Sequence, residues 1–198
     1  MNGHYSMESQ DQAWLARYRA GDVEALGEMM DHYRRPLLGF ILKMSADRTE
    51  AEDIFQDVWL RAIRRLHTFR RGRILSWLFR IAHNLVIDRA RKRGPAPPLT
   101  EWAAASGEAW TERVVATGAG PAAAAGHREL KARIDAAVGQ LPVEQRAVFL
   151  MRVEGDLPFK EIARIQRTSI NTALARMQYA LTKLREWLAD DYQLLARG

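Results

Sequence analysis

Apolar residues along most of the chain recur every three or four positions, which is the spacing of one buried face of an α-helix. From residue 11 to residue 93 this pattern is almost continuous. Gly21 interrupts it, and Asp22 can cap a second helix that we expect to end near Met44. The first part of the chain therefore predicts a bundle of helices.

The clearest amphipathic segment lies between about residues 49 and 67. Its start, TEAE, predicts a capping box in which Thr49 accepts a backbone hydrogen bond and Glu52 reaches back. Its apolar positions form one wide stripe: Ile54, Phe55, Val58, Trp59, Ala62, Ile63 and Leu66. The break RRGR follows, and a helix from about Ile74 to Lys92 comes next. That helix is expected to bury Leu75, Leu78, Ile81, Ala82 and Leu85.

The segment from residue 94 to residue 127 is rich in proline, glycine and alanine and poor in periodic apolar residues. This composition is typical of a flexible linker. Trp102 and Trp110 are exceptions, for which docking on a partner and a short helix are both open interpretations. The pattern thus predicts an all-α fold of two small domains, at residues 11–93 and 128–190, joined by a linker at 94–127.

The second domain ends in a pattern typical of DNA-binding proteins. A helix after Pro142 is expected to stop at Gly155, and the short helix FKEIARIQ then leads through a tight turn to a long helix capped by Ser169. A short and a long helix joined in this way match a helix-turn-helix.

The long last helix is expected to bury one stripe and expose the other. The predicted buried stripe contains Ile170, Leu174, Met177, Leu181, Leu184 and Leu188. Opposite it lie residue types that contact bases or phosphates in a major groove, namely Thr172, Arg176, Tyr179 and Lys183. An ordinary solvated face is the alternative, and the preceding helix and turn favour DNA.

Charge and composition narrow the class of protein. The 198 residues carry a formal net charge of +6, and basic residues cluster in RRGR and RARKR. Such clusters point to a polyanion, most often nucleic acid. The chain has no cysteine, which excludes a disulfide framework or a thiolate metal site. It also has no export signal and no apolar run of about eighteen residues, so we expect a soluble cytoplasmic protein.

Two blocks of the sequence resemble regions of a known family. Residues 51–93, from AEDIFQDVW to RARKR, are similar to conserved region 2 of bacterial RNA polymerase sigma factors, and residues 141–186 resemble their region 4. Region 2, a linker and region 4 together are similar to the extracytoplasmic-function (ECF) group of the sigma-70 family. The resemblance implies a factor without enzymatic activity or cofactor. Such a factor directs core RNA polymerase to promoters through the -10 and -35 elements and assists DNA opening.

The resemblance also implies site residues in region 2. The clamp helices of the polymerase largest subunit would bind Asp53, Gln56 and Asp57. The -10 element would be held by a basic loop and the helix after it, through Arg70, Arg71, Arg73, Trp77, Arg80, Asn84, Asp88 and Arg91. A core position for Trp77 is the alternative.

In region 4, the last helix of the family enters the major groove of the -35 element. This assigns DNA contacts to Arg167, Ser169, Asn171, Thr172, Arg176, Tyr179 and Lys183. Leu174, Arg167 and Pro158 depart from the usual Lys, Gly and Ser of the family. We expect Leu174 on the buried stripe, with the loss of one DNA contact, and Arg167 in a less regular turn because a positive φ strains residues other than glycine.

The resemblance further implies that region 4 contacts the polymerase flap and that an anti-sigma factor is a possible partner. Two other classes of function stay open. One is a stand-alone regulator whose helix-turn-helix binds an operator. The other is an enzyme such as a nuclease, using His83 with Asp88 or His32 with Asp31. The sequence contains no metal-ligand spacing, P-loop or nucleophile elbow that supports an enzyme.

Overall fold

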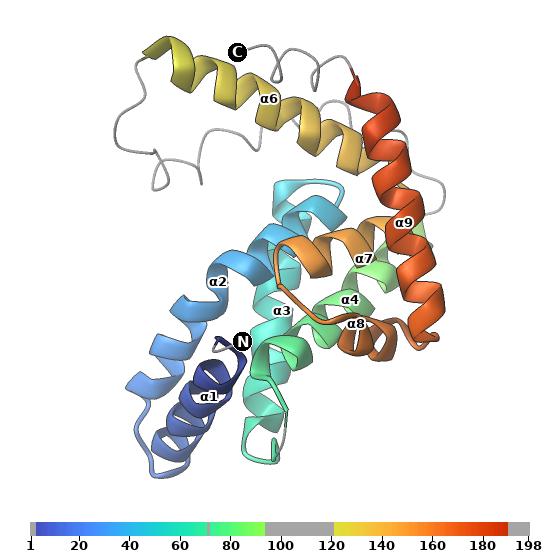
Figure 1. The fold of residues 1–198 in the computed structure, drawn as a ribbon. Coiled ribbons are helices and arrows are strands. Elements are labelled where there is room, and N and C mark those ends of the chain that lie inside the picture. The colour runs from blue at the N-terminus through green and yellow to red at the C-terminus, as the bar shows by residue number, and fades with distance from the viewer. Residues whose placement is uncertain (1–2, 71, 94–120, 190–198) are drawn as a thin grey trace.

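The computed structural model describes residues 3–70, 72–93 and 121–189, and these ranges contain 8 helices and no strand. The predicted all-α class is confirmed. The first unit consists of α1 (Gly3–Arg19), α2 (Glu24–Met44), α3 (Arg48–Leu66) and α4 (Ile74–Arg93). The second consists of α6 (Pro121–Gln140), α7 (Val143–Val153), α8 (Phe159–Gln166) and α9 (Ile170–Trp187) (Figure 1).

The segment predicted as a linker ends earlier than its composition indicates. Helix α6 begins at Pro121, so the last residues of the segment 94–127 are helical. Alanine is a good helix former, and the run of four alanines after Pro121 fits the start of a helix once a proline occupies its first position. Trp102 and Trp110 lie outside the described residues.

The core of the first unit is formed where α2, α3 and α4 meet. The predicted stripes of α3 and α4 are buried, except that Phe55, Ile63 and Ile81 are half-buried. Leu37 and Ile41 of α2 complete this core and are fully buried. Helix α2 ends at Met44, as predicted.

The start of α3 differs from the prediction by two residues. Asp47, and not Thr49, caps the helix and accepts a hydrogen bond from the Glu50 amide at 2.7 Å. The Glu50 carboxylate reaches back to the amide of Ala46 at 2.7 Å. The capping box is therefore DRTE, which starts the helix earlier and uses a carboxylate as the cap.

A buried carboxylate joins α1, α2 and α4. Asp11 of α1 is only 1% exposed; its Oδ1 accepts a hydrogen bond from the Tyr33 hydroxyl, and its Oδ2 accepts one from the Ile74 amide at 2.9 Å. The negative charge sits at the N-terminus of α4, where the helix dipole favours it. Burial nevertheless raises the pKa of the Asp11 carboxyl, against the opposing effects of Tyr33, Ile74 and Arg73.

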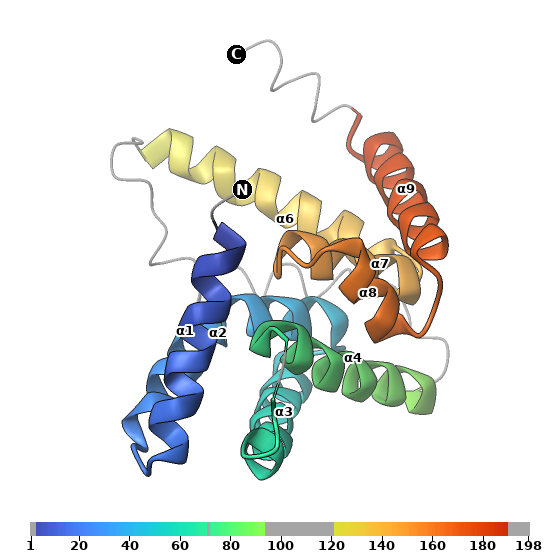
Figure 2. The same ribbon diagram turned by 60° about the horizontal axis from the view of Figure 1, so that its bottom comes forward.

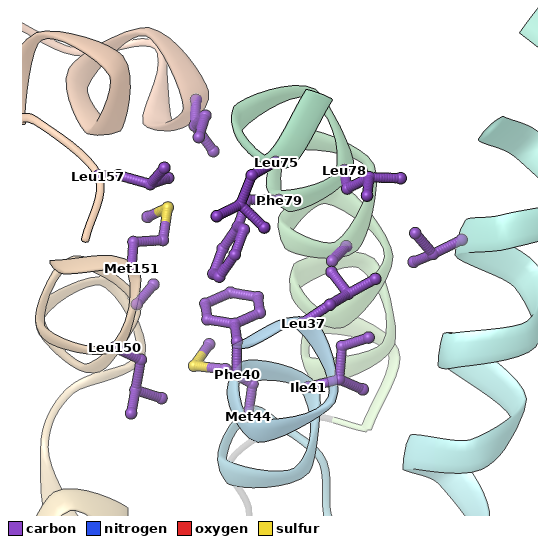
Figure 3. Close-up of a cluster of buried hydrophobic side chains, with 14 of the residues drawn as sticks. Leu37, Phe40, Ile41, Met44, Leu75, Leu78, Phe79, Leu150, Met151 and Leu157 are labelled. Carbon is purple, nitrogen blue, oxygen red and sulfur yellow. The ribbon is translucent and has the colours of Figure 1, made fainter. Parts of the chain in front are cut away.

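The two units share one hydrophobic core. Helix α2 packs on α6 and α7, and α4 packs on α7 and α8. Figure 3 shows the rings of Phe40 and Phe79, 5.1 Å apart, facing Met151 and Leu157 of the second unit. In the views of Figures 1 and 2, α7 and α8 lie between the first unit and α9.

Asp11→Ala is expected to lower the free energy of unfolding by about 3 kcal/mol, because it leaves the Tyr33 hydroxyl and the Ile74 amide buried without their acceptor. Asp11→Asn keeps the shape and removes the titration. Since the folded-state pKa of Asp11 is raised, the stabilisation from its protonated form is complete below about pH 3.9 and is lost as the pH rises through the folded-state pKa.

The stability advantage of the native chain over Asp11→Asn should therefore shrink as the pH rises above about 3.9 and through the folded-state pKa. Urea denaturation of both chains at several pH values measures this difference. A constant difference across that range would contradict the raised pKa.

Candidate functional site

Helix α4 presents one polar stripe to solvent. Trp77, Arg80, Asn84, Asp88 and Arg91 recur at three and four residues, and each is exposed or half-buried, whereas most apolar residues on the other sides of the helix are buried. The five residues predicted for the -10 element on this helix thus lie on one face. Their contact with DNA stays a prediction.

The arginines described in the basic loop before α4 differ in their exposure. Arg70 is exposed, and Arg73 is half-buried, where its charge acts on the Asp11 carboxylate. Arg71 lies outside the described residues. The position of Arg73 gives it a structural partner that the sequence did not indicate.

Trp77 is half-buried and packs against Phe69, with the ring centroids 5.1 Å apart and the rings inclined at 39°. The guanidinium of Arg19 in α1 donates a hydrogen bond to the carbonyl of Phe69. Phe69 was missed by sequence reasoning, because an aromatic residue in a loop has no periodic partner that marks it. The two rings form an aromatic platform at the start of α4.

The exposed face of α3 combines acidic groups with one apolar side chain. Arg89 of α4 lies 3.9 Å from the Asp53 carboxylate and 3.5 Å from that of Asp57. These contacts are solvent-exposed and weak, so both carboxylates stay available to a partner. Gln56 is exposed on the same face, and so is Leu60, which is 54% exposed. Leu60 was not predicted, although an apolar residue within a polar stripe is a detectable signal.

The helix-turn-helix has the predicted N-cap and an unexpected, regular turn. Ser169 caps α9 and accepts a hydrogen bond from the Thr172 amide at 3.0 Å. Arg167 adopts the left-handed conformation, with φ 54°, and the following Thr168 amide donates to the Ala163 carbonyl at 2.9 Å. The turn therefore keeps the usual geometry of a helix end, with the strain placed on Arg167.

The predicted buried stripe of α9 is wrong at its first two positions. Ile170 is 45% exposed and Leu174 is 44% exposed, whereas Ala173 and Ala180 are fully buried. Helix α9 packs on both α7 and α8, and small side chains allow this close approach. Leu174 therefore lies on the outward face of the helix.

Arg176 is held inside the second unit. Its guanidinium donates to Gln166 Oε1 at 2.7 Å and to Glu144 Oε2 at 3.3 Å, and its side chain is 27% exposed. This network ties α9 to α7 and α8. The outward face of α9 is formed instead by Asn171, Leu174, Gln178 and Tyr179.

The histidines considered for an enzyme lie in different surroundings. His83 is 7% exposed and Asp88 is exposed, and the ring of His32 packs on those of Trp14 and Tyr33. Within the described ranges, no group of three or more His, Cys, Asp or Glu side chains is placed to hold a metal ion. None of the described helices is long and apolar enough to cross a membrane.

Comparison with known families gives two matches. Residues 29–95 match Sigma-70 region 2, and residues 131–184 match Sigma-70, region 4. The chain is 31% identical over 186 residues to the ECF RNA polymerase sigma factor SigW of Bacillus subtilis, covering 93% of this chain and 100% of that protein. It is 29% identical to the ECF RNA polymerase sigma factor RpoE of Cereibacter sphaeroides, covering 89% of this chain and 95% of that protein.

Two solved structures share the fold. One is the sigma factor RpoE in complex with the anti-sigma factor NepR from Bartonella quintana, with a TM-score of 0.61 and 22% identity, covering 83% of this chain and 96% of that chain. The other is CnrH in complex with the cytosolic domain of CnrY, with a TM-score of 0.65 and 20% identity, covering 92% of this chain and 99% of that chain.

Arg167→Gly is expected to raise the free energy of unfolding by about 0.5–1 kcal/mol, because glycine adopts the left-handed conformation without strain. Arg167→Ala is the matched control, since it removes the charge and keeps the strain. Thermal denaturation of the three chains measures both effects. Equal melting temperatures for the glycine and alanine variants would show that the strain at residue 167 costs nothing.

Proposed function

The chain belongs to the ECF sigma factors of the sigma-70 family. We propose that it directs core RNA polymerase to promoters through three separate helix faces, each of which makes a different contact. The observation that carries this division is the placement of the polar faces of α3, α4 and α9. Each face lies on a helix whose other sides are packed in the core. The faces are therefore rigid and pre-oriented.

The α3 face binds the clamp helices of polymerase through Asp53, Gln56 and Asp57. The two carboxylates provide electrostatic complementarity to basic groups, which governs the rate and orientation of association. Leu60, which is 54% exposed, adds an apolar contact in the same patch. Asp53 and Asp57 lie one turn apart on α3, and Arg89 is within 4 Å of both carboxylates.

The stripe of α4 holds the opened -10 element. The aromatic platform of Phe69 and Trp77 offers a surface on which an unpaired base stacks, and such stacking stabilises binding by about 1–3 kcal/mol per base. Arg70, Arg80 and Arg91 supply positive charge for the strand backbone. Asn84 and Asp88 supply hydrogen-bonding groups on the same side of the helix.

The outward face of α9 reads the -35 element. Asn171 and Gln178 are the residue types that pair with adenine, and Leu174 suits the methyl group of thymine. The face therefore favours A·T base pairs. Tyr179 on this face, and Lys183 and Arg167 beside it, contact phosphates, next to the backbone amides at the start of α9. The Ser169 and Thr172 hydroxyls are engaged with each other in the cap, 2.8 Å apart.

The remaining parts of the function follow from the family. The chain carries out no covalent chemistry, acts in the cytoplasm with core polymerase, and uses region 4 on the polymerase flap. An anti-sigma factor is a further partner, supported by the fold shared with two sigma factors solved in complex with NepR and CnrY. Free in solution, the chain is expected to bind promoter DNA weakly.

Transcription in vitro with purified core polymerase on a library of random promoters tests the proposed function. Added chain should give new transcripts from templates that share two short elements with a fixed spacing. Tight, sequence-specific binding of DNA by the isolated chain, with no stimulation of polymerase, would favour the stand-alone regulator instead.

The division of roles on α9 predicts different effects for neighbouring residues. Gln178→Ala should relax the base preference at one position of the -35 element, with a loss of about 1–3 kcal/mol of discrimination. Arg176→Ala should leave the preferred bases unchanged and lower the melting temperature, because it breaks the contacts to Gln166 and Glu144. Library transcription and thermal denaturation measure the two effects. A changed base preference in Arg176→Ala at unchanged stability would contradict the assignment.

A further inference from the structure

The loop between α3 and α4 is held by α1 at both of its ends. At the first end, the guanidinium of Arg19 donates a hydrogen bond to the carbonyl of Phe69. At the second end, the carboxylate of Asp11 accepts a hydrogen bond from the Ile74 amide at 2.9 Å. The C-terminal ends of α1 and α3 lie at the same end of the first unit in both views (Figures 1 and 2). One helix therefore contacts the basic loop on both sides.

The loop between these contacts has little to fix its own conformation. It turns at Gly72, whose φ of 96° is a conformation that glycine adopts without strain. The same freedom gives a glycine turn many conformations when no outside contact selects one. Arg70, on the other side of the loop, is exposed and adds little buried surface. The contacts with α1 therefore select the conformation of the loop.

The two contacts differ in what they stabilise. Asp11 is 1% exposed and also holds the Tyr33 hydroxyl, so it belongs to the core of the first unit. Arg19 is exposed, and a hydrogen bond in contact with solvent contributes little to the stability of the fold. What Arg19 holds is the backbone of Phe69, whose ring packs on that of Trp77. The contact of Arg19 therefore fixes the place of the aromatic platform.

Helix α1 is a rigid support for this contact. It packs on α2, and the Arg17 guanidinium lies 2.8 Å from the Glu28 carboxylate of that helix. The indole of Trp14 donates to the same carboxylate at 2.9 Å and is 5% exposed. Helix α1 ends before residue 29, where the match to Sigma-70 region 2 begins. A segment outside the matched region thus supports the loop proposed for the -10 element.

We propose that Arg19 is a positioning residue of the -10 site. By holding the carbonyl of Phe69, it keeps the rings of Phe69 and Trp77 in the place where an unpaired base stacks. Arg19 acts through the loop and does not itself contact DNA. Helix α1 is then a working part of promoter opening. This inference rests on the proposed function, which assigns base stacking to the platform.

Arg19→Ala tests this role, with Arg17→Ala as the matched control. Arg17→Ala removes the same charge from the same helix and leaves both loop contacts in place, and its exposed ion pairs contribute little to stability. Transcription is measured with core polymerase on a promoter recovered from the library. A second template carries the same promoter with mismatched bases that leave the -10 element already unpaired.

The ratio of initiation on the duplex template to that on the mismatched template is the decisive measurement. Arg19→Ala should lower this ratio about fivefold, which is the lower end of the contribution of one stacked base. The mismatched template needs no opening, so its initiation should fall much less. Arg17→Ala should keep the native ratio. A 2-aminopurine base in the -10 element reports unstacking directly, and its fluorescence should rise more slowly with Arg19→Ala.

Two further variants separate positioning from a direct contact. Phe69→Ala removes the ring and keeps the carbonyl, so Arg19→Ala should cause no further loss in this background. Arg19→Lys keeps a cationic donor and should recover part of the ratio. Circular dichroism during heating should give similar melting temperatures for Arg19→Ala and Arg17→Ala.

Three results would overturn the positioning role. One is the same ratio for Arg19→Ala and Arg17→Ala. Another is an independent loss from Arg19→Ala in the Phe69→Ala background, which would indicate a direct contact with DNA or polymerase. The third is an equal loss on both templates with a lowered melting temperature, which a purely structural residue would give. If the native chain stimulates transcription on no template, the proposed function itself fails, and this inference fails with it.

Discussion

Helix α4 is buried along two of its sides, and this constraint determines where the proposed contacts lie. One side packs on α2 and α3, and another packs on α7 and α8. The stripe from Trp77 to Arg91 stays exposed or half-buried and is the surface proposed for a strand of DNA. The same helix carries Arg89, which pairs with the acidic face of α3. The surfaces proposed for the -10 element and for polymerase are therefore held in a fixed relation by one rigid element.

The sequence predicted those features that depend on local interactions. Helical periodicity located α2, α3 and α4, and the polar stripe of α4 follows from the same period. The cap of α3 shows the limit of this reasoning. Two overlapping segments, beginning at Asp47 and at Thr49, each fit a capping box, and the pattern alone does not rank them. The box at Asp47 forms because it gives a stronger cap and a longer helix.

The features that the sequence did not predict depend on contacts between distant segments. Leucine is more hydrophobic than alanine, yet α9 buries Ala173 and exposes Leu174 because only a small side chain fits against α7 and α8. Arg176 lies 32 residues from Glu144 along the chain, so no local pattern indicates their contact. The contact between the two units also depends on distant segments. In the sequence, the residues that form it look like ordinary core positions and a mid-helix glycine.

In the proposed function, base reading depends on single helix faces, because the remaining sides of α4 and α9 pack against other helices. The contact between the units also depends on charge. A partly buried ion cluster favours one arrangement of the helices, since its desolvation is repaid only in the correct geometry. Lys43 with Glu154 and Asp135 is such a cluster and joins α2 to the second unit. The arrangement of the units in the free chain therefore depends on these charges as well as on the shared apolar core.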